Sequence, residues 1–357
     1  MSHFTVLVIG DDVEESLAPY HEFECTGRDD GFVKDIDITE RCRKEFTEAT
    51  ETVYVAPDGT ASRSYEDQFY RDPTEEEAKE HGRMMGSGCG GGISWTSKDW
   101  GDGRGYRAKV HFLPEGYRQE ERKTSDRTTF SEWVADYHGR KTVLYGEQPD
   151  LKEAHKYGYA LLNADDTVTK VIDRTNPNKH WDWWQIGGRW SDMLQLKSGG
   201  RADQARKGDI DFAAMRQAKE SEAAADYDKF HQIVAGRQIP VWDEVRKRHG
   251  DGKIDDARKE YNENPVIVDL RKSDYIFWDG SPQDYLIPRE AFIEAAGDRA
   301  CVTFAVVKDG QWYERGEMCM FAFVHNEMDQ AEWNRQFHKM IDSLPDDALL
   351  TVVDCHI

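Results

Sequence analysis

Both ends of the chain read as buried β-strands. The segment "HFTVLVIG" (3–10) is a nearly continuous apolar run that stops at a glycine, and "ALLTVVDCHI" (348–357) is a second such run. Short apolar runs rich in Val, Ile and Leu are typical of strands that are covered on both faces of a sheet. We therefore expect the two termini to lie in one sheet, where His3 would come near His356.

The segment before the last strand is helical in pattern. "MDQAEWNRQFHKMIDSL" (328–344) follows the strand-like "CVTFAVVKDG" (301–310), whose last two residues are a turn signal. A helix followed by a final strand resembles the second half of a ferredoxin-like unit. The predicted fold class is α+β: a mixed or antiparallel sheet that contains both termini, partly ferredoxin-like, with a helical insertion.

The predicted insertion covers residues 202–262. This segment is helical in pattern and holds 12 basic and 13 acidic residues, whereas the whole chain has a net charge of −22. The rest of the chain, residues 1–201 and 263–357, is expected to form the α+β core, and the whole to be one compact unit. Within the core, residues 157–175 predict a hairpin that turns at residues 163–166.

Composition excludes some classes of protein. The apolar fraction is 38% and the mean hydropathy is −0.81, but 11% of the residues are aromatic, which indicates a folded chain with much polar surface. Residues 1–80 hold 8 basic and 22 acidic residues. This excess predicts either a solvated acidic surface or a face that docks on a basic partner. Broad binding to duplex DNA needs a basic footprint and is not expected.

The stretch "HWDWWQIGGRW" (180–190) contains four of the eleven tryptophans. As a strand it would place tryptophans on both faces, so that it is buried on both sides or buried on one and exposed on the other. One interpretation is a core plug with a Gly-Gly turn. The other is a nucleotide-binding surface, in which indoles stack on a base, Gly187 and Gly188 open backbone amides to a phosphate, and Arg189 binds it.

Under the second interpretation the ligand is a nucleotide-like small molecule. The predicted ligand-binding residues are Trp181, Trp183, Trp184, Gly187, Gly188, Arg189, Trp190 and Arg201. The predicted acid–base candidates are Asp173, Asp182 and Asp203, because they lie in this stretch or near it along the chain. The structural alternative for these carboxylates is a surface ion pair.

The Gly-rich run at 86–92 is the other segment that invites a phosphate-loop interpretation. It lacks the Gly-Lys-Ser/Thr ending of a P-loop and is not framed by a strand and a helix. A flexible loop or lid is the favoured interpretation. Cys89 within it is a candidate nucleophile with no base that the sequence identifies.

A divalent metal is a further possibility, for which the candidate ligands are His3, His21, Cys355 and His356. No pair of them shows the spacing of a zinc finger. Cys355 and His356 would point to opposite faces of a strand, and the alternative is a buried apolar cysteine beside an exposed histidine.

The six cysteines are dispersed without a CxxC pair, which is typical of reduced thiols in a cytoplasm. No apolar run approaches the ~20 residues of a membrane span, so a membrane partner is not expected.

The stretches "SHFTVLVIG", "WDWWQIGGRW" and the terminal "VVDCHI" resemble a family of uncharacterised proteins of bacteriophages and bacteria, especially actinobacteria. The resemblance spans nearly the whole chain. It implies a cytoplasmic protein, in the host cytoplasm if a phage encodes it, and carries over neither a reaction nor a catalytic residue.

Three functions follow from the sequence as hypotheses. The first is an enzyme or binding protein for a nucleotide-like ligand at the Trp and Gly-Gly-Arg surface. The second is a non-catalytic acidic protein that inhibits a host protein. The third is a metal-dependent hydrolase that uses the candidate histidines and Cys355.

Overall fold

The computed structural model describes residues 2–71, 74, 94–95, 108–136, 139–250, 253–273, 275, 281–318 and 323–357. The chain divides into two compact units. Unit 1 consists of Met1–Val33 and Asn176–Ile357, and unit 2 of Lys34–Thr175. The Gly-rich run at 86–92, with Cys89, lies outside the described residues.

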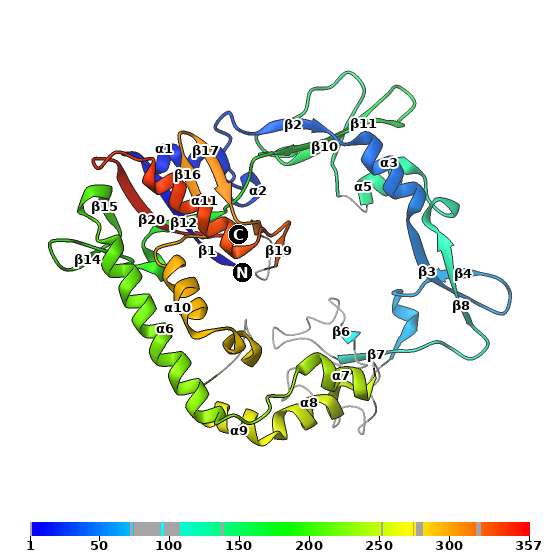
Figure 1. Cartoon of the computed structure of the whole chain (residues 1–357). Coiled ribbons are helices and arrows are strands. Elements are labelled where there is room, and N and C mark those ends of the chain that lie inside the picture. Colours follow the sequence, from blue (N-terminus) through cyan, green and yellow to red (C-terminus); the bar gives the residue numbers. More distant parts are fainter. Residues whose placement is uncertain are drawn as a thin grey trace. The chain divides into compact units, whose positions relative to one another are not determined.

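A mixed sheet in the order β12-β20-β1-β16-β17 forms the centre of unit 1, and β15 also pairs with β20. Its strands are β1 (His3–Ile9), β12 (Trp183–Ile186), β15 (Gln204–Arg206), β16 (Ala305–Lys308), β17 (Gln311–Glu314) and β20 (Leu349–His356). β1 and β20 are antiparallel neighbours, so both chain ends lie at this sheet, as Figure 1 shows. This confirms the expected pairing of the terminal strands, in a register that sets His3 opposite His356.

Alternation along the strands gives the sheet two apolar faces. On β1, Phe4, Val6 and Val8 belong to the core on one face, and Leu7 belongs to the core on the other. The second face is covered by α11 (Gln330–Asp342), whose Trp333, Phe337 and Ile341 recur at helical spacing and are buried. The Asp329 side chain caps this helix by accepting hydrogen bonds from the amides of Ala331 and Glu332.

After β1 the chain returns to this sheet in β12 and β15, and it then forms the β16–β17 hairpin, α11 and β20. The ferredoxin-like likeness is limited to these last elements, because β1 lies directly beside β16 and no strand separates the two parallel strands as in a split βαβ unit. The fold is therefore α+β, as predicted. β1 and β16 are parallel neighbours, which makes the sheet mixed rather than fully antiparallel.

Helices fill the segment between β15 and β16. They are α6 (Phe212–Val234), α7 (Trp242–His249), α8 (Ile254–Glu263), α9 (Pro265–Lys272) and α10 (Arg289–Asp298). The end of α6 packs on α9 through Phe230, Val234, Ile267 and Leu270. The predicted helical segment 202–262 thus begins with strand β15 at its N-terminal side and continues in helices as far as Asp298.

Short elements complete unit 1. They are α1 (Val13–Leu17), α2 (Phe23–Thr26), β13 (Leu194–Gln195), β14 (Arg201–Ala202), β18 (Glu317–Met318) and β19 (Val324–His325). The first two follow β1, and α1 contributes Leu17 to the core on the Phe4 side of the sheet.

The described part of unit 2 contains small sheets and two helices. Its elements are β2 (Lys34–Asp37), α3 (Thr39–Glu48), β3 (Thr50–Val55), β4 (Ala61–Arg63), β5 (Tyr70–Arg71), β6 (Ser94–Trp95), β7 (Ala108–His111), β8 (Arg118–Lys123), α5 (Phe130–Asp136), β9 (Thr142–Val143), β10 (Gly158–Leu162) and β11 (Val168–Thr175). The predicted hairpin is confirmed as β10 and β11, and its turn holds Asp166 at a φ of 60°.

The division into units differs from the predicted one, which placed residues 1–201 in a single core with 263–357. Residues 34–175 have a core of their own, in which Ile38, Trp133 and Val171 are buried together. The first and last strands of this segment, β2 and β11, also pair with each other. A segment that closes on itself in this way needs no strand from the rest of the chain.

Candidate functional site

Three side chains stand in a row across the strands β12, β20 and β1. His356 is directly opposite His3 on one side and Trp183 on the other. Residues that are directly opposite in a sheet point to the same face, so the two imidazoles and the indole share one surface. We call Trp183, His356 and His3 the histidine row.

A buried carboxylate holds His3. Its Nδ1 lies 2.8 Å from Oδ1 of Asp354, whose side chain is only 1% exposed. The other oxygen, Oδ2, accepts a hydrogen bond of 3.0 Å from the backbone amide of Arg189. The sequence predicted no role for Asp354, although the register that sets His3 opposite His356 places it on the same face, two residues before His356.

A second carboxylate holds His356. Its Nδ1 lies 2.6 Å from Oδ1 of Asp182, and the backbone amide of Asp182 donates to the carbonyl of His356 at 2.9 Å. Asp182 was a predicted acid–base candidate. The structure places it beside an imidazole, where it orients the ring.

The two imidazole rings face one space. Their centroids are 4.9 Å apart and their planes meet at 72°, and the Trp183 ring lies 6.1 Å from His3 and is 46% exposed. Because each Nδ1 lies within hydrogen-bond distance of a carboxylate, each Nε2 is the ring nitrogen left to meet a ligand. Neither Nε2 has a hydrogen-bond partner in the part of the chain that the structure describes. The row therefore offers two oriented bases or metal ligands.

The Gly-Gly turn after β12 makes room for two carboxylates of the chain itself. Gly187 and Gly188 have φ values of 69° and 56°, in the left-handed region that favours glycine. A Cβ on Gly188 would lie against Cβ of Asp354, and one on Gly187 against the carboxylate of Asp203, well inside van der Waals contact. The turn therefore allows Asp354 to reach both His3 and the Arg189 amide.

Some amides of the expected phosphate cradle make hydrogen bonds within the chain. The Gly187 amide donates to the Val352 carbonyl at 2.9 Å, the Trp190 amide to the Gly187 carbonyl at 3.0 Å, and the Arg189 amide to Asp354. These amides are therefore engaged within the chain. The Arg189 side chain is exposed and forms no ion pair with a described residue.

The tryptophans divide between the core and the surface. Trp181 is buried and its Nε1 donates to the Leu17 carbonyl at 3.0 Å, and Trp184 packs half-buried against the same core. Trp190 is half-buried against the core on the α11 side. The stretch thus seals the core on one face and exposes Trp183 beside the histidines.

The other predicted acid–base and arginine candidates have structural partners. Asp173 lies on β11 of unit 2 and pairs with Arg140. Asp203 accepts a hydrogen bond from the Asp192 amide at 2.6 Å, and Arg201 donates to the Asp192 carbonyl at 3.3 Å. Asp203 and Arg201 therefore hold the loop that follows the Gly-Gly turn.

Two predicted metal ligands are not near the row's free nitrogens. Cys355 is fully buried in the core on the opposite face, where burial raises the pKa of its thiol. His21 is 1% exposed, and its ring nitrogens lie 2.9 Å from the carbonyl oxygens of Ala18 and Arg28. Cys355 therefore packs as a buried apolar side chain, and His21 is held by backbone carbonyls.

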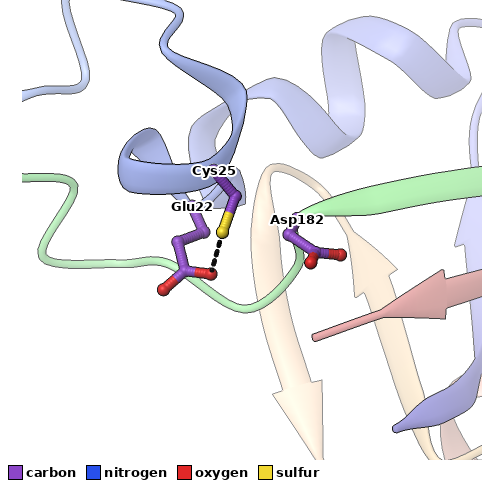
Figure 2. A group of neighbouring side chains, drawn as sticks. All are labelled: Glu22, Cys25 and Asp182. Carbon is purple, nitrogen blue, oxygen red and sulfur yellow. Dashed lines mark hydrogen bonds between the residues drawn. The ribbon is translucent and has the colours of Figure 1, made fainter. Parts of the chain in front are cut away.

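A group that sequence reasoning missed lies on the other side of Asp182. Glu22, Cys25 and Asp182 have potential ligand atoms within 4.8 Å of one another, and the Cys25 thiol donates to Glu22 at 3.2 Å (Figure 2). Burial, with the neighbouring carboxylates, raises the pKa of this thiol to about 11. The thiol is therefore protonated at neutral pH, in keeping with its role as a hydrogen-bond donor to Glu22.

Comparison of the chain with protein-family models, with curated proteins and with solved structures found no match. Among the helices in the described part of the chain, none combines the length and the apolar character needed to cross a membrane.

Proposed function

We propose that the chain binds a nucleotide-like phosphodiester at the histidine row and hydrolyses it by general acid–base catalysis. The observation that carries this proposal is the pair of imidazoles 4.9 Å apart, each with its Nδ1 on a carboxylate. Imidazole is the most frequent general acid or base in enzymes, and a carboxylate on Nδ1 fixes both its tautomer and its orientation.

The reaction uses both imidazoles. The neutral ring takes a proton through Nε2 from the attacking water as the new oxygen–phosphorus bond forms. The protonated ring gives its Nε2 proton to the leaving oxygen as the old phosphorus–oxygen bond breaks. The products are a phosphomonoester and an alcohol, and proton exchange with solvent restores the starting state of the two rings.

Two neighbours supply binding. The exposed Trp183 indole can stack on a base, which contributes about 1–3 kcal/mol per base in comparable sites. The Arg189 guanidinium, on the residue whose amide holds Asp354, supplies a cation for the phosphate.

The test is hydrolysis of bis-p-nitrophenyl phosphate by purified protein. His3→Gln and His356→Gln should each lower kcat by roughly 10²–10⁴ with an unchanged melting temperature. His325→Gln, which removes an exposed histidine on β19, is the matched control and should keep full activity. Wild-type protein without activity above the uncatalysed rate, or equal activity in all variants, would refute the proposal.

A metal-dependent hydrolase is a second candidate, favoured by one observation. Histidines that ligate zinc donate their other ring nitrogen to a carboxylate, as His3 and His356 do here. Chelation distinguishes the two candidates. Full activity after treatment with EDTA supports the acid–base reaction, whereas loss of activity that zinc restores supports the metal.

The phage origin and the acidic docking face stay predictions of the sequence. A host-lysate pulldown that weakens strongly with salt would support charge-driven docking, and capture that is independent of salt would count against it.

A further inference from the structure

A small cavity adjoins the histidine row. It has a volume of about 270 Å³, and Trp183 and Asp182, which contact His3 and His356, are among the residues that line it. Drug-sized ligands occupy cavities of about 300 Å³ or more. The cavity therefore has room for one ring system and not for a run of stacked nucleotides.

The inner wall of this cavity is rigid. It contains Trp181 and His21, both buried, with the indole nitrogen of Trp181 and the ring nitrogens of His21 bonded to backbone carbonyls. Trp184, half-buried against the core, also lines it. Indoles around a space of this size favour a flat aromatic ligand.

The charge around the cavity disfavours a phosphate. Asp182 lines it, and the Glu22 carboxylate lies within 4.8 Å of Asp182. Arg28, which also lines the cavity, is paired with Glu14 at 3.4 Å. A group with N–H donors is therefore better suited to this space than an anion, which leaves the phosphate to the histidines and Arg189.

We propose that the cavity takes the base of the nucleotide-like ligand and that the Asp182 carboxylate selects guanine. This inference rests on the proposed function, because it places the scissile phosphate at the histidine row. A carboxylate accepts hydrogen bonds only, and its two oxygens offer about four acceptor positions. His356 contacts Oδ1 of Asp182, no hydrogen bond from a described residue is recorded at Oδ2, and Asp182 lines the cavity.

Guanine matches these acceptors better than the other bases. Its Watson–Crick edge presents two adjacent donors, the ring N1–H and the exocyclic amino group. Adenine and cytosine present an amino group next to an unprotonated ring nitrogen, which would face the carboxylate with a lone pair. Uracil presents one N–H between two carbonyl oxygens. A carboxylate oxygen of Asp182 that is left unpaired, or that faces a lone pair of the base, lowers the binding affinity. This loss is large enough to separate guanine from the other bases.

The test is calorimetric binding of GMP, AMP, CMP and UMP to the full chain. GMP should bind at least roughly tenfold more tightly than AMP, as expected for one well-formed pair of hydrogen bonds to a base. Asp182→Asn should bring the GMP and AMP affinities to within about threefold, since the amide presents a donor to the base. Asp192→Asn, an exposed carboxylate outside the cavity, is the matched control and should keep the preference.

Trp183→Ala provides a second variant if Asp182→Asn does not fold. It removes an exposed side chain and should weaken all four nucleotides by roughly 5–100-fold without a change in the circular dichroism spectrum. Equal affinities for the four nucleotides in the wild type, or a guanine preference that survives Asp182→Asn, would overturn the inference.

Failure of this inference is distinguishable from failure of the proposed function. Bis-p-nitrophenyl phosphate carries no base, so its histidine-dependent hydrolysis without any guanine preference would retain the reaction and reject the cavity assignment. A guanine preference lost in Asp182→Asn, in a protein that hydrolyses nothing, would retain the cavity and reject the reaction.

Discussion

Asp354 carries a charge at a position with almost no exposure to solvent. A buried carboxylate is costly unless it is paired and hydrogen-bonded, and here His3 and the Arg189 amide supply both contacts. The Gly-Gly-Arg sequence suggests a binding site for the anionic group of a ligand. In the structure it instead makes room for the side chain of Asp354. The nearly buried Asp354 is therefore the residue that most constrains the geometry of the site.

Asp354→Asn tests this positioning role. The amide keeps the size of the side chain but replaces one acceptor oxygen by an NH2 donor, so it can no longer accept at both atoms from His3 and from the Arg189 amide. We expect kcat for a phosphodiester to fall by about 10²-fold or more, together with a shifted pH profile. Loss of stability with an unchanged kcat and pH profile in the folded fraction would assign Asp354 a structural role only.

Gly188→Ala tests the space that the turn provides. The new Cβ would meet Cβ of Asp354, and the positive φ adds strain, so the free energy of unfolding should fall by about 2–4 kcal/mol. Gly199→Ala is the matched control. It has a φ of 89° but nothing within 4 Å, and should cost about 1 kcal/mol. Urea denaturation measures both, and equal losses would mean that the Asp354 contact is unimportant.

At the scale of elements, the first residue of the stretch 180–190 packs on β17. The His180 ring stacks on Trp312 with centroids 4.4 Å apart and planes at 5°, and its Nδ1 lies 3.4 Å from a Glu314 carboxylate oxygen. Burial lowers the pKa of His180 to about 4 and raises the pKa of Glu314. The contact of His180 with Trp312 and Glu314 therefore makes the packing of the stretch 180–190 on β17 dependent on pH.

The direction of that dependence is set by the unfolded chain. Below the ordinary imidazole pKa of 6.5 the unfolded chain takes up a proton that folded His180 refuses until about pH 4, so this contribution to stability is lost as pH falls through that window. Glu314, with its raised pKa, acts in the opposite sense, since its contribution is lost as pH rises. The effect of His180 therefore has to be isolated by substitution.

His180→Phe keeps a flat ring and removes the titrating group. Between pH 6.5 and about 4 the wild type should lose on the order of 2 kcal/mol more stability than this variant, after allowance for partial exposure. Urea denaturation at several pH values measures the difference. Parallel stability curves for the two proteins would contradict the lowered pKa.

Elements with strong local patterns could be predicted from the sequence. The terminal strands, their pairing and the β10–β11 hairpin follow from apolar runs and turn residues, and the approach of His3 to His356 follows from that pairing. The partners of the Gly-Gly turn could not be predicted, because Asp203 and Asp354 reach it from other strands and loops. No spacing in the sequence relates Cys25 to Asp182 either.

At the scale of the whole molecule, unit 2 is an insertion into unit 1. Its first and last residues, Lys34 and Thr175, are opposite each other in the β2–β11 pair. Such partners have Cα atoms about 5 Å apart. The two ends of the insertion, which connect it to unit 1, are therefore close together. This division could not be predicted from the sequence, because unit 2 has the same mixture of helix and strand patterns as unit 1.

Replacement of residues 34–175 by a Gly-Ser linker of about four residues tests the division, since such a linker spans that gap. We expect unit 1 to fold, to unfold cooperatively in urea and to keep the kcat of the full chain on bis-p-nitrophenyl phosphate. A shortened chain with no cooperative transition would show that unit 1 depends on the insertion.

The most direct measurement on the histidine row is the kcat of the double variant His3→Gln/His356→Gln beside its two single variants, on bis-p-nitrophenyl phosphate with EDTA present. Groups that act as one catalytic unit are strongly non-additive, so removal of the second imidazole should lower kcat by no more than a few-fold beyond the first. If the losses of the single variants multiply in the double variant, the imidazoles act independently and the paired mechanism is contradicted.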